Sequence, residues 1–260
     1  MVKTQRSDVV RAARAGSTAP DREKVLEGAA QFAVNGEEIV ALTCGAAYVP
    51  AHQTLLVADL HFEKGSSFAR KGVLLPPYDT RTTLKRLLYV VRALAPKRVI
   101  SLGDAFHDTE AEGRMAPSDA DRLNALQREA AWTWILGNHD PAPPARFKGE
   151  VAEEMILGRL FLTHEPTGTP RPGEVAGHLH PCAKVKAQSR TIRRRCFLAD
   201  DRRMILPAFG AYTGGLNILD GAFEGLCDRP VAWVLGGEGV YPFTMAGLLP
   251  DPAPIARMAG

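Results

Sequence analysis

A strand signal followed at once by metal-binding side chains occurs several times along this chain. The strongest case is the run 132–136, Trp-Thr-Trp-Ile-Leu, which predicts a short buried strand and is followed by Gly137-Asn138-His139-Asp140. Other apolar runs end in the same manner, at Asp59-Leu60-His61, Gly103-Asp104, His164 and Gly177-His178-Leu179-His180. Because functional side chains are typically carried on loops that a rigid scaffold positions, these clusters predict a functional site.

The first half of the chain alternates strands with helices. The expected elements are, in chain order, a strand at 55–58, a helix at 79–95, a strand at 98–102, a helix from Pro117 and a strand at 132–136. We expect Asp79 or Thr80 to cap the first helix and Pro96 to end it. This order favours parallel strands with right-handed crossovers, and ligands bind such sheets at the carboxyl ends of the strands.

The second half has a different character. Short β-like runs alternate with Gly turns between about residues 154 and 235, which indicates a β-rich, antiparallel half. An earlier hairpin is predicted at Asn35-Gly36, a pair that suits a type I′ turn. The Gly-rich segment 207–215 either lines the mouth of a site or forms a tight turn. The expected organisation is a flexible N-terminal tail at 1–30, one domain at 31–249 and a C-terminal tail at 250–260. A short amphipathic helix is the alternative for residues 1 to about 24.

Composition narrows the class of protein. With 260 residues, 45% of them hydrophobic, the chain can bury a full core. The formal net charge of +3 allows an anionic substrate without requiring nucleic acid. The four Cys are scattered, there is no long apolar run, and the N-terminus lacks the apolar core of a signal peptide. We therefore expect a reduced, cytoplasmic protein that does not enter a membrane.

The polar clusters together supply oxygen and nitrogen donors for metals: Asp59, His61, Asp104, Asn138, His164, His178 and His180. Imidazole suits Zn, Mn, Fe and Ni, whereas carboxylate and amide oxygens favour harder ions such as Mn. The donors include no Cys, which disfavours a structural thiolate site. They are too many for one tetrahedral ion, but they fit two ions, roughly 3.5–4 Å apart, that share a carboxylate and clamp a displacement at phosphorus.

Each donor alone also has a structural interpretation. A lone Asp is often a turn former or a helix cap, a lone His is often a core residue, and Asn138 alone would suit a turn. What favours the metal site is that all the clusters occur at the ends of successive predicted strands.

The ordered clusters resemble the five-block signature of the calcineurin-like metallophosphoesterase superfamily. Further stretches are similar to the bacterial DNA-ligase-associated metallophosphoesterases, over about residues 32–241. These stretches are residues 58–65, 75–80, 106–108, 177–181, 193–197 and 206–217.

The resemblance implies a fold and a set of residue roles. The fold is α/β (α+β), a four-layer αββα sandwich. One metal is held by Asp59, His61 and His180, the other by Asn138, His164 and His178, and Asp104 bridges them. A bridging hydroxide attacks phosphorus, His139 acts as general acid or charge stabiliser at the leaving oxygen, and Asp140 orients His139.

The same resemblance implies cofactors and partners. The metals are two divalent ions, Mn²⁺ first and then Zn²⁺, Fe²⁺ or Ni²⁺. The substrate is a phosphodiester, with DNA or RNA as candidates. Genes of this family lie beside an ATP-dependent DNA ligase, a helicase and a nuclease-like protein, which links the family to DNA repair. The candidate substrate-binding residues are His107, Lys64 and Arg194, each with an ordinary loop or solvated-edge role as the alternative.

Two other functions stay open from the sequence. The same metal chemistry would serve a hydrolase of small nucleotides or other soluble phosphoesters. A non-catalytic scaffold is the third interpretation, although scaffolds of this fold usually lose ligands and this chain retains the full set. The oligomeric state is not readable from the sequence.

Overall fold

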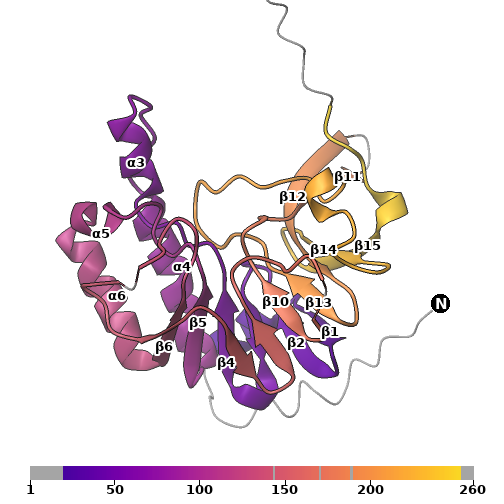
Figure 1. Ribbon diagram of the computed structural model, residues 1–260, viewed down its shortest axis with the longest axis horizontal. Helices are drawn as coiled ribbons and strands as arrows, with labels where there is room; N and C mark the ends of the chain where they lie inside the picture. The colour runs from indigo at the N-terminus through magenta and orange to yellow at the C-terminus, as the bar shows by residue number, and fades with distance from the viewer. Residues whose placement is uncertain (1–19, 143, 170, 188–189, 253–260) are drawn as a thin grey trace, which may run out of the picture.

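The fold consists of two β-sheets packed face to face, with helices over one of them (Figure 1). The structure is a computed structural model that describes residues 20–142, 144–169, 171–187 and 190–252. The expected tails therefore lie largely outside the described residues, namely 1–19 and 253–260. Among the described residues, every helix is too short or too polar to span a lipid bilayer.

The first sheet has seven strands in sequential order. They are β1 (Ala30–Val34), β2 (Glu37–Ala41), β3 (Ala47–Val49), β4 (Thr54–Val57), β5 (Arg98–Leu102), β6 (Ala131–Ile135) and β7 (Glu150–Ala152). Strands β4 to β7 run parallel, as the strand–helix alternation predicts. The hairpin β1–β2 is confirmed, because Asn35 (φ 51°) and Gly36 (φ 77°) both have the positive φ of a type I′ turn.

The second sheet has eight strands. Its order is β15 (Val240–Thr244), β14 (Val231–Leu235), β12 (Arg190–Ala199), β13 (Arg203–Ile205), β10 (Glu174–Ala176), β9 (Leu160–Leu162) and β8 (Met155–Leu157), with β11 (Cys182–Ala187) paired to β12. The expectation of an antiparallel half is wrong for β9, β10 and β13, which pair in parallel. Because β9, β10 and β13 run in the same direction, their carboxyl ends share one edge of the sheet.

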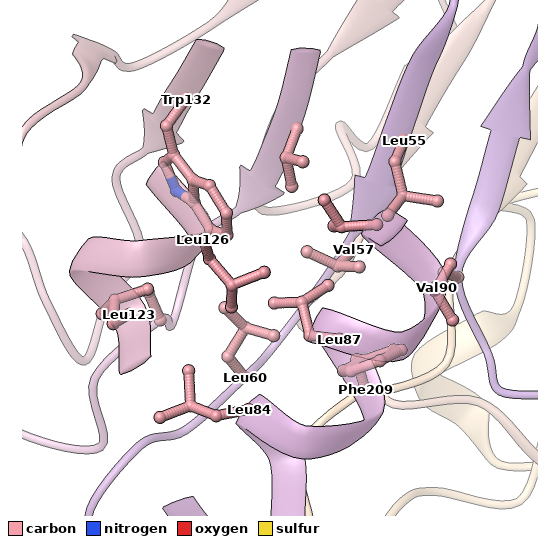
Figure 2. Close-up of a cluster of buried hydrophobic side chains, with 14 of the residues drawn as sticks. Leu55, Val57, Leu60, Leu84, Leu87, Val90, Leu123, Leu126, Trp132 and Phe209 are labelled. Carbon is pink, nitrogen blue, oxygen red and sulfur yellow. The ribbon is translucent and has the colours of Figure 1, made fainter. Parts of the chain in front are cut away.

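Helices cover the outer face of the first sheet. They are α2 (Pro20–Leu26), α4 (Asp79–Leu94), α5 (Ala111–Arg114) and α6 (Pro117–Glu129), whereas α3 (Lys64–Arg70) projects beyond the end of the sheet (Figure 1). Figure 2 shows this packing: Leu87 of α4 and Leu126 of α6 lie against Val57 of β4 and Trp132 of β6. A second apolar layer fills the space between the sheets, with Leu56 and Ile100 on one side and Val175 and Phe197 on the other. Both faces of the central strands are thus buried.

The outer face of the second sheet is covered without long helices in the described part of the chain. The cover consists of loops and the 3₁₀ turns η2 (Gly221–Phe223) and η3 (Met245–Gly247). Phe223, Leu226 and Leu248 from this region pack against Val234 and Leu198 of the sheet. A further 3₁₀ turn, η1 (Pro50–His52), joins β3 to β4. The predicted sandwich of the α/β class is confirmed, and its fourth layer is a thin one.

Two local expectations are corrected. The side chains of Asp79 and Thr80 do not cap α4, whose N-cap residue, Tyr78, makes no side-chain cap bond. Asp79 instead accepts a hydrogen bond from the Gly65 amide at 2.8 Å, and Thr80 accepts one from the Glu63 amide at 2.8 Å. These bonds fasten the start of α3 to α4, so the two polar residues stabilise a tertiary contact.

The domain also begins earlier than residue 31. Helix α2 packs beside α4, where Val25 is buried and the Arg22 guanidinium donates a hydrogen bond to the Leu94 carbonyl at 3.2 Å. Residues 20–30 are therefore part of the fold. The alternative of a short helix therefore holds at the end of the expected tail, where one large apolar pair, Val25 and Leu26, marks it in the sequence.

We predict that Leu87→Ala lowers the free energy of unfolding by about 2–5 kcal/mol, because it leaves a cavity where α4 meets β4. Leu87 is fully buried. Urea denaturation followed by circular dichroism measures the change, and Lys85→Ala, an exposed position on the same helix, is the control at within about 0.5 kcal/mol. Equal effects of the two substitutions would contradict the packing described for α4.

Candidate metal centre

The predicted metal-binding residues lie at the carboxyl ends of strands from both sheets. Asp59 and His61 follow β4, Asp104 follows β5, and Asn138 and His139 follow β6. From the second sheet, His164 follows β9, and His178 and His180 follow β10. The carboxyl ends of parallel strands meet at one edge of each sheet, and the facing sheets bring the two edges together.

The backbone at these residues is unusual. Asp59, His61, Asp104, His178 and His180 all have positive φ, between 43° and 67°. Residues other than Gly rarely adopt this left-handed conformation, and each such residue costs of order 1–3 kcal/mol. A concentration of such residues in one place points to a functional site, because the surrounding structure must hold them there.

One group of donors comprises Asp59, His61 and His180. The Nε2 atoms of His61 and His180 lie 3.2 Å apart, and Asp59 Oδ1 lies 3.3 Å from His180 Nε2. These three ligand atoms lie within 4.8 Å of one another. Asp59 also accepts a hydrogen bond from the His178 amide at 3.0 Å, which ties the loop after β4 to the loop after β10.

The second group comprises Asn138, His164 and His178. Asn138 Oδ1 lies 3.0 Å from both His164 Nε2 and His178 Nδ1. Asp104 lies between the two groups, with Oδ1 at 3.4 Å from His164 Nε2 and Oδ2 at 3.8 Å from His61 Nε2. Its carboxylate thus faces both groups, as a bridging ligand requires.

Backbone carbonyls set the orientation of two imidazoles. His164 Nδ1–H donates to the Leu102 carbonyl at 3.0 Å, which leaves the Nε2 lone pair free toward the second group. His139 Nδ1–H donates to the His107 carbonyl at 2.8 Å, so its Nε2 points toward Asp104 Oδ2, 3.9 Å away. Sequence reasoning missed these partners because a carbonyl acceptor carries no residue-type signal.

The donor set fits divalent cations. Asp59 and Asp104 are buried carboxylates, and among the described residues the basic groups within 4.0 Å of them are imidazoles. Burial, together with the neighbouring His180 and Lys64, lowers the pKa of His61, so this imidazole is neutral in the metal-binding form. Two buried carboxylates whose nearby cation is the half-buried Lys64 would be further compensated by bound divalent ions.

The orienting role expected for Asp140 belongs to the His107 carbonyl. Asp140 instead accepts hydrogen bonds from the Phe106 amide at 3.0 Å and the Gly137 amide at 3.1 Å, which join the loops after β5 and β6. Burial, together with the nearby Asp104 charge, raises the pKa of Asp140 to about 6. Through these hydrogen bonds Asp140 fixes the backbone of the loop that carries His139.

The candidate substrate residues are spread around the centre. His107 Nδ1 lies 3.3 Å from His61 Nδ1, and its ring stacks on that of His139 at 5.1 Å. Lys64 is half-buried near the carboxylates, where burial lowers its pKa and Asp104 and Asp59 oppose that shift. Arg194 is exposed on β12, and its hydrogen bond goes to the neighbouring Arg193 carbonyl.

A cleft of about 400 Å³ opens beside His139. Its lining includes Ser67, Arg70 and Lys71 from the α3 region and His107 and Asp108 from the loop after β5. Although burial acts to raise it, hydrogen bonds from Arg114 and Ser67 lower the pKa of Asp108 to about 2. The cleft next to the candidate general acid, His139, is therefore lined by charged side chains.

The Gly-rich segment 207–215 is hydrogen-bonded to the chain that leads into the candidate ligand Asp59. The amides of Phe209 and Gly210 donate to the carbonyls of Ala58 and Asp59 at 2.8 and 3.1 Å, and a Cβ at Gly210 would lie 2.2 Å from the Leu60 carbonyl oxygen. Close approach, and not a positive φ, explains the glycine. The guanidinium groups of Arg86 and Arg195 donate to the Phe209 and Ala208 carbonyls, respectively.

We predict that Gly137→Ala weakens metal binding by at least about tenfold, because the added Cβ would lie 2.3 Å from both the amide nitrogen and Oδ1 of Asp104. Isothermal titration calorimetry with Mn²⁺ measures the affinity, and circular dichroism checks the fold. The matched control is Gly113→Ala on α5, where a Cβ meets nothing within 4 Å. Equal Mn²⁺ affinity in both variants would contradict the placement of Asp104.

Comparisons with known proteins agree with this architecture. Residues 52–193 match the calcineurin-like phosphoesterase family, a stretch that contains every candidate ligand. The crystal structure of Pseudomonas putida nuclease MPE has 28% sequence identity with the chain and a TM-score of 0.63, covering 83% of this chain and 100% of that one.

A phosphoesterase from E. coli, YfcE, is more distant, with 14% identity and a TM-score of 0.36 over 75% of this chain and 98% of that one. No curated protein sequence gives a significant match. The family match spans more than half of the chain, and the described residues include groups of His and Asp side chains that could hold metal ions. The chain belongs to the calcineurin-like phosphoesterase family and is a metal-dependent phosphoesterase.

Proposed function

We propose that the protein is a phosphodiesterase that uses two metal ions to cleave phosphodiester bonds in nucleic acid. The observation that carries this proposal is the pair of donor groups, Asp59–His61–His180 and Asn138–His164–His178, on either side of Asp104. When bound, two divalent ions would supply Lewis acidity at phosphorus and at the attacking water. Mn²⁺ is the proposed ion, because the donors combine imidazoles with carboxylate and amide oxygens.

His139 is the proposed acid at the leaving oxygen. Its side chain is 40% exposed, so a substrate can reach it, whereas Asp104 beside it is 3% exposed. The His107 carbonyl fixes the ring through Nδ1, which leaves Nε2 as the atom that gives or shares a proton. A negatively charged leaving oxygen near Nε2 would be stabilised by that proton.

Lys64 and the adjacent cleft are the proposed binding elements for the rest of the substrate. The Lys64 ammonium lies near the carboxylates and adds positive charge on the substrate side. The cleft lined by Arg70, Lys71 and Ser67 offers hydrogen-bond donors beside His139. A leaving group larger than a single oxygen, such as the next nucleotide of a strand, would fit there.

A nucleic-acid substrate is supported by the similarity to a protein named as a nuclease, at 28% identity over the full length of that protein. We further propose a role in DNA repair in the cytoplasm, in functional association with an ATP-dependent DNA ligase, a helicase and a nuclease-like protein. This part rests on the motif resemblance, which extends through the segments 58–65 and 206–217.

We predict that the protein hydrolyses bis-p-nitrophenyl phosphate faster than p-nitrophenyl phosphate, loses the activity in EDTA, and regains it with Mn²⁺. His139→Ala should lower kcat by about 10²–10⁴-fold with its metal content intact, because it removes a proton donor and no ligand. Asp104→Asn should lower both turnover and metal content, because it removes the shared carboxylate. Mass spectrometry of the metals together with initial rates distinguishes the two variants.

Three results would change the assignment. Unaltered turnover in both variants would refute the mechanism. Far better hydrolysis of dinucleoside polyphosphates than of diesters and DNA would indicate a hydrolase of small nucleotides. No turnover with Mn, Zn, Fe, Ni, Co or Mg would favour a scaffold that binds a partner without catalysis.

A further inference from the structure

We propose that the β11–β12 hairpin is a second substrate-binding element, one that holds the phosphate backbone of a DNA strand beyond the metal centre. This inference rests on the proposed function, since it concerns the same substrate. It begins from the charge of the hairpin, whose residues 182–187 and 190–195 contain no carboxylate. Its cations are Lys184, Lys186, Arg190, Arg193, Arg194 and Arg195.

The pairing of the two strands keeps these charges close together. Lys184 lies directly opposite Arg193, and Lys186 lies opposite Thr191, next to Arg190 at the end of the ladder. Like charges at directly opposed positions of an antiparallel pair destabilise it. In the described ladder the one directly opposed pair of like charges is Lys184 and Arg193, and Asp251 partly offsets it. The remaining net positive charge of the hairpin favours a polyanion as its ligand.

The base and the outer part of the hairpin differ in their contacts. At the base, Arg193 pairs with Asp251 at 3.4 Å and Lys184 donates to the Pro250 carbonyl at 3.2 Å. Lys186 and Arg190 lie farther out, and Arg194 lies one position closer to the base. All three are exposed, and none of them forms an ion pair in the part of the chain that the structure describes. These three cations are available to a ligand.

Packing makes the hairpin a firm support. Val185 on β11 is buried, and Ile192 opposite it packs against the apolar cluster on the outer face of the second sheet. A binding surface held on packed strands loses less conformational entropy on association than a free loop would. The cations are therefore held on a packed ribbon, with Lys184, Lys186 and Arg193 on one face and Arg190 and Arg194 on the other.

The hairpin is directly connected to the metal centre. Strand β11 begins at Cys182, two residues after the ligand His180. At about 3.3 Å per residue, Lys186 lies at most about 20 Å of extended chain from His180, a length that corresponds to about six phosphates at 3.4 Å each. A strand whose scissile phosphate is at the metals can thus reach Lys186.

The other side of the centre carries a matching element. Helix α3 begins at Lys64, three residues after the ligand His61, and its C-terminal end brings Arg70, which is paired with Glu110, and the following Lys71 to the cleft beside His139. Figure 1 shows α3 and the β11–β12 hairpin at the same edge of the molecule, on either side of the loops that follow the parallel strands. A chain of phosphates would contact basic residues on both sides of the cleaved bond.

The test compares DNA binding by two variants of equal charge change. Lys186→Glu/Arg190→Glu alters the hairpin, and Lys85→Glu/Arg128→Glu alters exposed positions on α4 and α6. The probe is a fluorescent, cleavage-resistant phosphorothioate strand of about 20 nucleotides, bound to the Mn²⁺-loaded protein and followed by anisotropy. With a single strand, each lost phosphate contact lowers the slope of log Kd against log salt by about 0.7.

We expect the hairpin variant to bind at least about tenfold more weakly at about 0.1 M salt, with the slope reduced by about 1.4, and the control to stay within about twofold of the parent protein. Binding by the hairpin variant that equals binding by the control would overturn the inference. Equal displacement of the probe by polyglutamate and by unlabelled DNA would also overturn the inference, because that result indicates an acidic protein as the partner.

A second readout separates this inference from the proposed function. The hairpin variant should lose activity on a DNA strand relative to its activity on bis-p-nitrophenyl phosphate, which is too short to reach Lys186. An unchanged ratio contradicts the inference and leaves the phosphodiesterase assignment intact. Weakened DNA binding in a protein that hydrolyses neither substrate supports the hairpin surface and refutes the catalytic assignment.

Discussion

Hydrogen bonds between loops hold the candidate ligands in left-handed backbone conformations, and the centre depends on them. The Asp59 amide donates to the Gly103 carbonyl at 3.3 Å, the His61 amide to Asp104 at 2.9 Å, and the Gly177 amide to His164 at 2.9 Å. Each bond joins the loop after one strand to the loop after a neighbouring strand. Since left-handed residues cost of order 1–3 kcal/mol each, a lone loop would relax, whereas interlocked loops cannot relax singly.

The sheets are what allow the loops to interlock. Strands β4, β5 and β6 in one sheet and β9, β10 and β13 in the other are parallel triplets, so each sheet presents its loops at one edge. The segment after β13 completes the arrangement, because Arg195 holds its Ala208 carbonyl at 2.6 Å while the Phe209 amide donates to Ala58 of the first sheet. Burial lowers the pKa of Arg86, the second arginine at this segment, to about 10, and this remains well above neutrality. Arg86 and Arg195 therefore both donate charged hydrogen bonds to the segment 208–209, which in turn contacts the chain next to Asp59.

Sequence patterns predicted the parallel part of the first sheet and the polar clusters, because apolar runs and ligand-type side chains are visible locally. They missed the parallel pairing of β9, β10 and β13, since strands of three residues carry no signal for direction. They also assigned Asp79 and Thr80 to a helix cap, when both bond to the start of α3. A residue that suits a cap equally suits a tertiary hydrogen bond, and only the fold decides between them.

The division of the site between two sheets has a consequence for the substrate. Each sheet contributes ligands and also continues past them into a basic element, α3 after His61 and the β11–β12 hairpin after His180. Because each ligand loop leads directly into its basic element, the position of the loop determines where the basic side chains of that element lie. Metal binding and binding of an extended anion would thus be fixed by the same loop contacts, and the strain at His61 and His180 (φ 43° and 46°) lies at the junction of the two.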